Sequence, residues 1–438
     1  MSKLSGKTLA HITLGCKVNM YDTQAMIEIL EKSGVRVVDF ESGVPADIFI
    51  INTCTVTNSG DKKSRQAIRK AVKANPNAVI VVCGCYSQVD SETVLAIEGV
   101  DLILGTKDRM RIAEFIEQHL EGKKQKNFVS RLDDQAEFED LSITQPGDKV
   151  RAYIKIQEGC ENFCAYCIIP YARGPIRSRV KESILAEAVK LTGAGVKEIV
   201  LAGINAGNYG KDKPGSGLSL SALIRDLHEI EGVRRIRLGS VEPDAVDEEF
   251  LQTFSDCEKL CDHLHLSLQS GSDRTLSAMN RRYNSAEYAE KIAKLRQIRP
   301  NIGITTDIIV GFPGESDKDF ADSYNFVENA EFSRVHVFPY SPKTGTKAAA
   351  MKEQVPAGIK AQRAKQMSEL ADRLCKKFTE KFENTILSVL FEQEIGKNVY
   401  EGHSDNYIVV RKQGKPGLVN QIMTVKGKAQ KGGTIMVI

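Results

Sequence analysis

Residues 152–167, AYIKIQEGCENFCAYC, join a short apolar run to three closely spaced cysteines. The run 152–157 predicts a β-strand, and Cys160, Cys164 and Cys167 follow in the loop after it. Three thiolates at this spacing can bind three irons of a four-iron cluster and leave the fourth iron without a protein ligand. A structural zinc site needs four protein ligands, and no second cysteine pair has the spacing to complete one. We therefore expect this strand to lead into an iron–sulfur site.

Five further strand-and-helix units follow this first strand. The predicted strands are 198–202, 235–239, 263–268, 303–310 and 334–338, and helices are predicted at 182–192, 220–230, 285–298 and 317–328. Repeats of this kind predict a closed or incomplete (β/α)6 barrel. Polar and glycine-rich loops follow every strand, and the carboxyl ends of barrel strands build the active site, so these loops should converge on one cavity.

The first 120 residues also alternate strands with helices. Strands are predicted at 10–14, 46–51, 78–82 and 102–104, with helices at 22–32, 59–73 and 109–120, which indicates an α/β domain with a parallel sheet. Cys16, Cys54 and Cys85 each follow one of these strands, so they can meet at one edge of the sheet and hold a second cluster with an open iron. Core packing is the alternative for each cysteine alone. Cys83 is interpreted as a strand-end neighbour of Cys85.

The C-terminal part is basic. A long helix is predicted at 357–383, and the short runs 385–391, 407–410, 421–425 and 434–438 predict a small all-β barrel. Residues 395–438 hold seven basic residues against two acids, a net charge of +5. The basic residues are Lys397, Arg411, Lys412, Lys415, Lys426, Lys428 and Lys431. This charge suggests that a polyanion is held near an active site, and a solvated face is the alternative.

Composition limits the class of protein. The 438 residues, 42% apolar and 27% charged, indicate a globular chain and exclude a disordered or collagen-like one. No apolar run is long enough for a membrane span, and the N-terminus does not resemble a signal peptide, so we expect a soluble cytoplasmic protein. Ten cysteines in such a protein favour metal binding over disulfides. We predict an α/β domain at 1–125, a linker at 126–149, a barrel at 150–374 and a β-barrel at 375–438.

The cysteine spacing, with Tyr166 directly before the third cysteine, resembles the signature of the radical S-adenosylmethionine enzymes. Together, the three predicted domains resemble the methylthiotransferase family along essentially the whole chain, and the C-terminal part is similar to a TRAM RNA-binding domain. The stretch Leu14-Gly15-Cys16-Lys17-Val18-Asn19, followed by Tyr21-Asp22-Thr23, resembles the branch that acts on N6-threonylcarbamoyladenosine in tRNA.

The resemblance implies a reaction. A methylthio group would be added at C2 of N6-threonylcarbamoyladenosine at position 37 of tRNA. Two S-adenosylmethionine molecules would be used: one gives methyl to a sulfur on the N-terminal cluster, and the other is cleaved to a radical at the barrel cluster. Both clusters would be of the 4Fe-4S type, and no side chain would act as an acid or base. The partners would be the tRNA anticodon stem-loop, an electron donor and a sulfur donor. No association with a membrane is expected.

The resemblance also implies residues that contact S-adenosylmethionine. They are Tyr166, Gly203, Asn205, Glu242, Gln269, Val310 and Gly311. Arg173, Arg177 and Arg179 follow the cluster loop and are candidates for RNA phosphate contacts.

Several alternatives stay open. The substrate could be isopentenyladenosine in tRNA or an aspartate of a ribosomal protein, and a non-catalytic iron–sulfur RNA-binding protein is an alternative of another class. Cys257, Cys261 and the nearby histidines could suggest zinc, but apolar packing is the favoured interpretation. His336 is interpreted as a histidine at the edge of the core.

Overall fold

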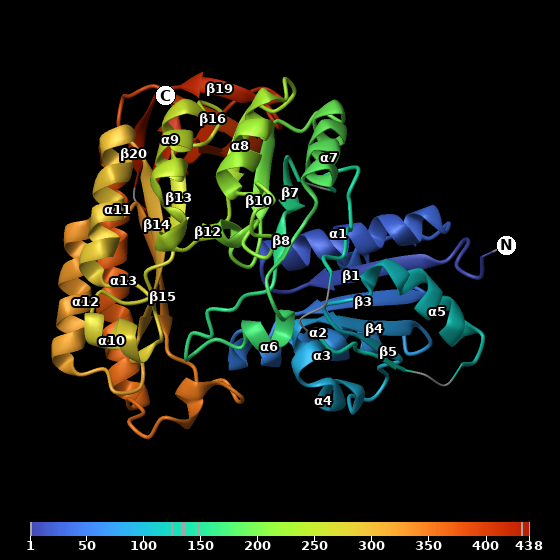
Figure 1. Cartoon of the computed structure of the whole chain (residues 1–438). Coiled ribbons are helices and arrows are strands. Elements are labelled where there is room, and N and C mark those ends of the chain that lie inside the picture. The colour runs from blue at the N-terminus through green and yellow to red at the C-terminus, as the bar shows by residue number, and fades with distance from the viewer. Residues whose placement is uncertain (1, 124–125, 133–136, 148, 431, 438) are drawn as a thin grey trace.

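A computed structural model of the chain describes residues 2–123, 126–132, 137–147, 149–430 and 432–437 (Figure 1). It contains a parallel sheet at the N-terminus, a curved half-barrel in the middle and a curled, mostly antiparallel sheet at the C-terminus. Lys431 of the basic C-terminal set and part of the predicted linker lie outside the described residues. Within the part of the chain that is described, no helix has the length and apolar character needed to cross a membrane.

The N-terminal sheet is parallel throughout, as predicted, with strand order β2-β1-β3-β4-β5-β6. Its strands are β1 (Thr8–Thr13), β2 (Arg36–Val37), β3 (Ile48–Thr53), β4 (Val79–Gly84), β5 (Leu102–Leu104) and β6 (Asn127–Phe128). Its helices are α1 (Lys17–Lys32), α2 (Asn58–Ala74), α3 (Cys85–Val89), α4 (Ser91–Leu95) and α5 (Ile112–Leu120). Separate apolar cores lie on the two faces of the sheet, which is why β3 and β4 are buried at every residue.

The segment predicted as a linker is packed against its neighbours. Its residues form β6 at the edge of the N-terminal sheet. Farther on, the Tyr21 hydroxyl donates to the carbonyl of Leu141 at 2.6 Å, and the carboxylate of Glu28 accepts from the backbone of Thr144 at 2.9 Å. These contacts hold α1 against the segment that leads into the half-barrel.

The central strands are all parallel and form two sheets, β11-β10-β7 and β12-β13-β14-β15, joined by a bridge between Ile236 and Leu260. The strands are β7 (Arg151–Lys155), β10 (Glu198–Ala202), β11 (Arg235–Leu238), β12 (Ser240–Val241), β13 (His263–Leu266), β14 (Gly303–Val310) and β15 (Arg334–Pro339). The helices are α6 (Ile169–Arg173), α7 (Lys181–Gly193), α8 (Leu220–Glu229), α9 (Glu248–Asp256), α10 (Asp273–Ala278), α11 (Ser285–Ile298) and α12 (Asp317–Ala330). A two-stranded ribbon, β8 (Gln157–Glu158) with β9 (Arg177–Ser178), flanks the cysteine loop. All six predicted strands are present.

The C-terminal sheet has strand order β19-β16-β17-β18-β21-β20 and follows a long helix (Figure 1). The elements are α13 (Ala357–Glu380), β16 (Leu387–Gly396), β17 (Val399–Ser404), β18 (Val409–Gln413), β19 (Ile422–Val425), β20 (Gly427–Gln430) and β21 (Thr434–Val437). The β18 and β21 strands pair in parallel, and the other pairs are antiparallel. The predicted domain boundary at residue 375 falls inside α13.

This C-terminal sheet covers the amino ends of the half-barrel strands. The ring of Tyr407 lies between the rings of His263 and His403, with centroids 4.5 and 4.6 Å away. Arg235 and Arg237, from the start of β11, donate to the carbonyls of His403 and Asp405 at 3.2 and 3.0 Å. One end of the half-barrel is therefore closed, and the cysteine loop lies at the other end.

Candidate functional site

Cys160, Cys164 and Cys167 lie between β8 and α6, where the chain leaves the first barrel strand. The loop folds back tightly at Gly159, whose φ is +79° and where a Cβ would lie 1.7 Å from the Pro175 carbonyl oxygen. The three thiols lie close enough to interact electrostatically. Burial raises the pKa of Cys160 to about 11 and that of Cys167 to about 12. A metal would have to displace these protons in order to bind.

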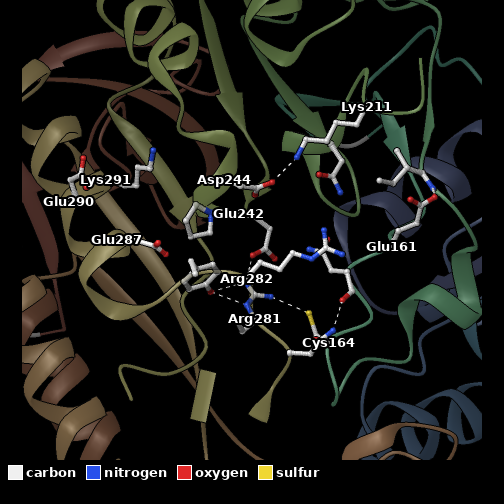
Figure 2. Close-up of a pocket in the computed structure, with 16 residues that line it drawn as sticks. Glu161, Cys164, Lys211, Glu242, Asp244, Arg281, Arg282, Glu287, Glu290 and Lys291 are labelled. Carbon is white, nitrogen blue, oxygen red and sulfur yellow. Dashed lines mark hydrogen bonds and ion pairs between the residues drawn. The ribbon is translucent and has the colours of Figure 1, made fainter. Parts of the chain in front are cut away.

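A cavity of about 610 Å³ opens beside this loop, and Cys164, Glu242 and Arg281 line it (Figure 2). Arg281 Nη1 donates to Cys164 Sγ at 3.3 Å, and Arg281 Nη2 donates to the carboxylate of Glu242. Arg281 Nε donates at 2.9 Å to the hydroxyl of Tyr283, which in turn donates to the backbone carbonyl of Leu268 just beyond the end of β13. The guanidinium is therefore fixed between the cysteine loop and the barrel.

Cys16, Cys54 and Cys85 come together at the carboxyl edge of the N-terminal sheet. Cys16 precedes α1, Cys54 follows β3 and Cys85 begins α3 directly after β4. Cys54 interacts electrostatically with both other thiols, and Cys85 interacts with Cys16. Burial raises the pKa of Cys54 to about 11. Cys83 is fully buried in the apolar core beneath the sheet.

The distances between the cysteine sulfurs are relevant to whether each set could bind a single metal ion or an iron–sulfur cluster. Where three or more ligand atoms must lie within 4.8 Å of one another, the described residues offer one group, formed by His265, Asp307 and His336. Neither cysteine set meets that limit. A four-iron cluster, whose thiolate ligands bind different irons, accepts more widely spaced sulfurs than a single ion does.

The two cysteine sets are linked through Arg173, which ends α6 six residues after Cys167. Its Nε atom donates to Cys85 Sγ at 3.3 Å, and its Nη2 atom donates to the side chain of Asn19. Asn19 also donates to the Leu14 carbonyl at 2.7 Å, which fixes the loop that carries Cys16. The helix that follows the loop of one cysteine set thus carries a side chain that contacts a sulfur of the other set.

Comparisons with known proteins identify this arrangement. A family model described as Uncharacterized protein family UPF0004 matches residues 8–105, and one described as Radical SAM superfamily matches residues 154–327. The chain is 42% identical over 424 residues to the threonylcarbamoyladenosine tRNA methylthiotransferase MtaB of Bacillus subtilis, covering 96% of this chain and 93% of the relative. The chain belongs to the methylthiotransferase family of radical S-adenosylmethionine enzymes.

Other relatives and structures agree with this placement. The methylthiotransferase chain is 36% identical over 423 residues to the tRNA-2-methylthio-N(6)-dimethylallyladenosine synthase of Clostridium tetani, covering 94% of this chain and 92% of the relative. Its fold is similar to that of the radical S-adenosylmethionine methyltransferase TsrM of Kitasatospora setae, with a TM-score of 0.58 at 14% identity over 77% of this chain and 74% of that one. As a radical enzyme of this family, it uses S-adenosylmethionine and 4Fe-4S clusters as cofactors.

The residues predicted to contact S-adenosylmethionine lie around the carboxyl ends of the strands. Among the described residues of that set, Glu242 lines the cavity in Figure 2. The others, which do not line it, are Tyr166, Gly203, Asn205, Gln269, Val310 and Gly311. Gln269 has a φ of 73° and bonds through its backbone to Asp307 and Ile309 of β14.

Two buried asparagines beyond β10 each have a side-chain nitrogen with no hydrogen-bond partner in the described part of the chain. The backbone N–H of Asn205 donates to the side chain of Gln157 at 3.0 Å, but the Nδ2 atom of Asn205 has no partner in the described part of the chain. The Nδ2 atom of Asn208, which lines the cavity, is also buried without a partner there. Unpaired buried donors are costly, so these amides fit a polar ligand at this edge of the barrel.

The prediction that Arg173, Arg177 and Arg179 contact RNA phosphates is wrong. Their exposed fractions are 0%, 5% and 1%. Arg173 pairs with Glu158, and Arg179 pairs with Glu187. These arginines lie where the N-terminal domain meets the half-barrel, and Arg177 donates to the backbone carbonyl of Arg173 at 2.9 Å. All three are therefore covered by protein contacts that a basic run in the sequence does not predict.

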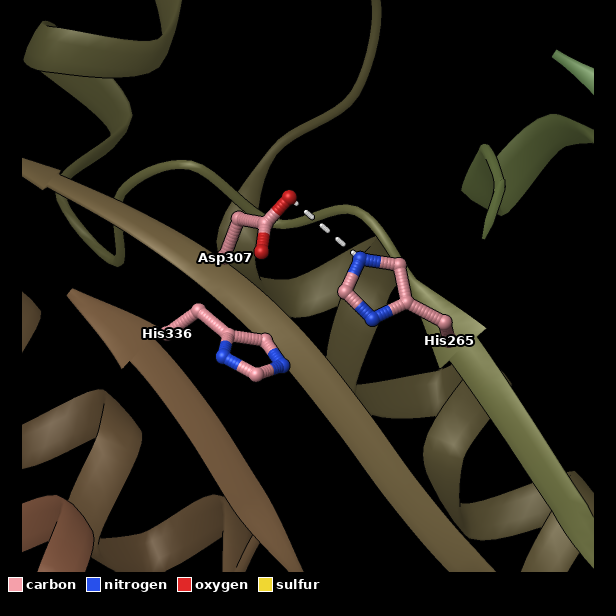
Figure 3. A group of neighbouring side chains, drawn as sticks. All are labelled: His265, Asp307 and His336. Atoms are coloured by element: carbon pink, nitrogen blue, oxygen red, sulfur yellow. Dashed lines mark ion pairs between the residues drawn. The ribbon is translucent and has the colours of Figure 1, made fainter. Parts of the chain in front are cut away.

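The histidines and the remaining cysteines separate into core and open positions. Cys257 is buried in the apolar core, as expected, with an exposed fraction of 3%. Cys261 is equally buried, but it lies close enough to Arg237 and Glu198 to interact with them electrostatically. His336 is not at the core edge as predicted: it is exposed and lies beside His265 and Asp307 (Figure 3). Alternation along a strand does not tell which face the helices will cover, so the sequence could not show that His336 faces away from them.

Proposed function

We propose that this methylthiotransferase adds a methylthio group at C2 of N6-threonylcarbamoyladenosine at position 37 of tRNA and consumes two S-adenosylmethionine molecules for each product. The placement of two three-cysteine sets around Arg173 supports this proposal most directly, because the reaction needs two clusters close together. The relative from Bacillus subtilis is named for this nucleoside.

The proposed ligands of the two clusters are the six cysteines of the two sets. Cys160, Cys164 and Cys167 would hold one cluster, and Cys16, Cys54 and Cys85 the other. When bound, the clusters and S-adenosylmethionine supply a radical that activates C2 and a sulfur that replaces its hydrogen. Each set offers three thiols, so one iron of each cluster stays free of protein ligands.

The chain's own residues bind, orient and exclude water. Arg281 and Glu242 form the polar wall of the cavity next to Cys164. Burial, more than any charged neighbour, raises the pKa of Glu242, and Arg281 opposes this rise. We propose that Tyr166, Gly203, Asn205, Gln269, Val310 and Gly311 surround S-adenosylmethionine together with Glu242. The domains on both sides of the half-barrel restrict access of water.

The proposed partner is the tRNA anticodon stem-loop, held by the C-terminal sheet as a TRAM-type domain. Lys397, Lys415, Lys426 and Lys428 are exposed there and form no ion pair among the described residues. Contacts with phosphates would fix the position of the RNA without reading its sequence. A separate electron donor and sulfur donor complete the reaction, which we place in the cytoplasm. The proposed domains keep the predicted order 1–125, 150–374 and 375–438, but β6 extends the first sheet to residue 128 and α13 crosses the last boundary.

Mass spectrometry of tRNA nucleosides tests the proposal. The reconstituted protein is incubated with tRNA carrying threonylcarbamoyladenosine, dimethylallyladenosine or unmodified adenosine at position 37. We expect the methylthio product on the first substrate only, and none with the Cys54→Ala variant. The buried cysteine variant Cys257→Ala serves as the matched control and should retain activity. A methylthio product formed only on tRNA with dimethylallyladenosine would show that this nucleoside is the substrate. Absence of both the methylthio product and deoxyadenosine would favour the non-catalytic alternative.

A further inference from the structure

His265, Asp307 and His336 come from three successive strands of the half-barrel, β13, β14 and β15 (Figure 3). Asp307 and His336 are register partners, and His265 is the register partner of Thr305, two residues before Asp307. Residues two apart on a strand share a face. The three side chains therefore project from one face, and one ligand atom of each lies within 4.8 Å of the others.

This face is the inner one. The alternate residues Leu264, Ile308 and Val335 belong to the core that packs against the outer helices. The exposed fractions of the His265 and Asp307 side chains are 15% and 30%, and His336 is exposed. The set is thus accessible from inside the half-barrel, between the cysteine loop at one end and Tyr407 at the other.

We propose that His265, Asp307 and His336 bind a divalent transition-metal ion. Two imidazoles and one carboxylate form a donor set that such ions accept, and they leave further coordination positions open. The Nε2 atom of His265 lies 3.3 Å from Oδ2 of Asp307. With metal–ligand bonds of about 2.0–2.2 Å, neighbouring ligands of a tetrahedral ion lie about 3.4 Å apart, so this pair of ligand atoms would need little movement.

The surroundings of His265 favour ligation. Its Nδ1 atom is engaged by the hydroxyl of Thr305 at 3.0 Å, so its Nε2 atom faces Asp307. A second hydrogen bond of this kind is the usual means by which a metal-ligating imidazole is oriented. The same hydroxyl also lies 3.2 Å from Nε2 of His263, which ties it to the base of the barrel.

An ion pair between His265 and Asp307 alone accounts for the arrangement of the three side chains less fully than a bound cation does. It leaves the ring of His336 with no hydrogen bond among the described residues, although that ring lies 6.0 Å from the ring of His265. A cation between the three groups would give every one of them a partner.

The test measures zinc bound to the full-length, anaerobically reconstituted protein, whose cysteines are then occupied by iron. Equilibrium dialysis against buffered Zn²⁺, followed by elemental analysis, should give one zinc per chain. His336→Gln and Asp307→Asn should each weaken zinc binding at least tenfold, and Thr305→Val should weaken it about tenfold. The matched control is His119→Gln, because His119 also lies beside a carboxylate, 3.8 Å from Asp101.

Iron content checks that the variants retain their fold, and His336 is exposed, so its replacement should be tolerated. Zinc should also raise the melting temperature of the parent and of His119→Gln, but not of His336→Gln. The proposal is overturned if the parent binds no zinc. It is also overturned if His336→Gln and Asp307→Asn bind zinc as tightly as the parent, or if His119→Gln loses it equally.

Discussion

The Nε atom of Arg173 lies 3.3 Å from the sulfur of Cys85, although the two residues belong to different domains. The same guanidinium contacts the carboxylates of Asp22 and Glu158 in a fully buried network. Although burial opposes it, the cations Lys155, Arg109 and Arg173 hold the pKa of Glu158 well below its usual value. Arg173 therefore joins the two domains and places a positive charge beside one cysteine set.

Replacing Arg173 by Met should destabilise the protein by about 3–5 kcal/mol, because it leaves buried carboxylates without their partner. The N-terminal cluster should also become easier to lose, since Cys85 loses its hydrogen-bond donor. Thermal unfolding and iron content check both effects. Arg281→Met, which removes the equivalent donor to Cys164, should leave the N-terminal cluster unchanged. Equal stability of Arg173→Met and the parent would contradict the role of the network.

Iron content also tests the six proposed ligands. Reconstitution should load about eight irons per chain, as two four-iron clusters. Replacing Cys16, Cys54 and Cys85 together should remove half of this iron. Cys83→Ala is the internal control, because its sulfur lies in the apolar core below the sheet. Loss of iron in Cys83→Ala, with the other three intact, would show that the ligand assignment is wrong.

The two cysteine sets should differ in function. Cys164→Ala should abolish formation of deoxyadenosine from S-adenosylmethionine, because its sulfur lies at the cavity beside Arg281. Cys16→Ala should leave this cleavage largely intact and abolish the methylthio product. Product analysis by chromatography and mass spectrometry separates the two effects. If Cys16→Ala methylthiolated tRNA at the parental rate, the N-terminal domain would have only a structural role, and the prediction would be wrong.

Salt dependence of tRNA binding tests the basic C-terminal sheet. Deleting the sheet would uncover the buried Arg235 and Arg237, so substitution is the cleaner experiment. Changing Lys415, Lys426 and Lys428 to Gln should lower the slope of log affinity against log salt by about 2–3, because each phosphate contact releases a counterion. Lys318→Gln, an exposed change on α12, should leave the slope unaltered. An unchanged slope in the triple variant would remove these lysines from the RNA interface.

Glu198 gives a pH-dependent prediction. Burial raises its pKa, but Arg237, Arg151 and Arg235 outweigh burial and lower it to about 2. The unfolded chain has a pKa near 4.3 and binds more protons between these values, so the stability from Glu198 is full above about pH 4.5 and is lost as the pH falls toward 2. Glu198→Gln should cost about 3–5 kcal/mol at pH 7. Urea unfolding of iron-free protein should show this difference shrinking below pH 4.

The sequence was sufficient to predict those features that depend on residues close together along the chain. The strands of the half-barrel follow from alternation of apolar runs and helices, and the loops with Cys16, Cys54 and Cys85 follow from the ends of parallel strands. The β17 and β20 strands were missed, and on the buried face of β17 Tyr400 is followed by Gly402 and Ser404, so the apolar alternation is interrupted. A Cβ at Gly402 would lie 2.0 Å from the carbonyl oxygen of Leu390, so only glycine allows this strand pair.

Charge partners could not be predicted in the same way. The role of Arg173 depends on Asp22, which is 151 residues earlier, and no spacing rule connects them. A basic residue after a cluster loop has the same local sequence whether it meets a phosphate or a buried carboxylate. Only the packing of the N-terminal domain against the half-barrel decides between these outcomes.

The insertion of Tyr407 between His263 and His403 has a consequence for RNA selection. Because this stack and the arginines around it hold the C-terminal sheet against the half-barrel, the sheet cannot swing independently of the cavity. The distance between the basic surface and the cysteine loop is then fixed. RNA bound to the sheet, as proposed, would then present to the cysteine loop only the nucleotide found at that distance, so the spacing itself would select the position that is modified.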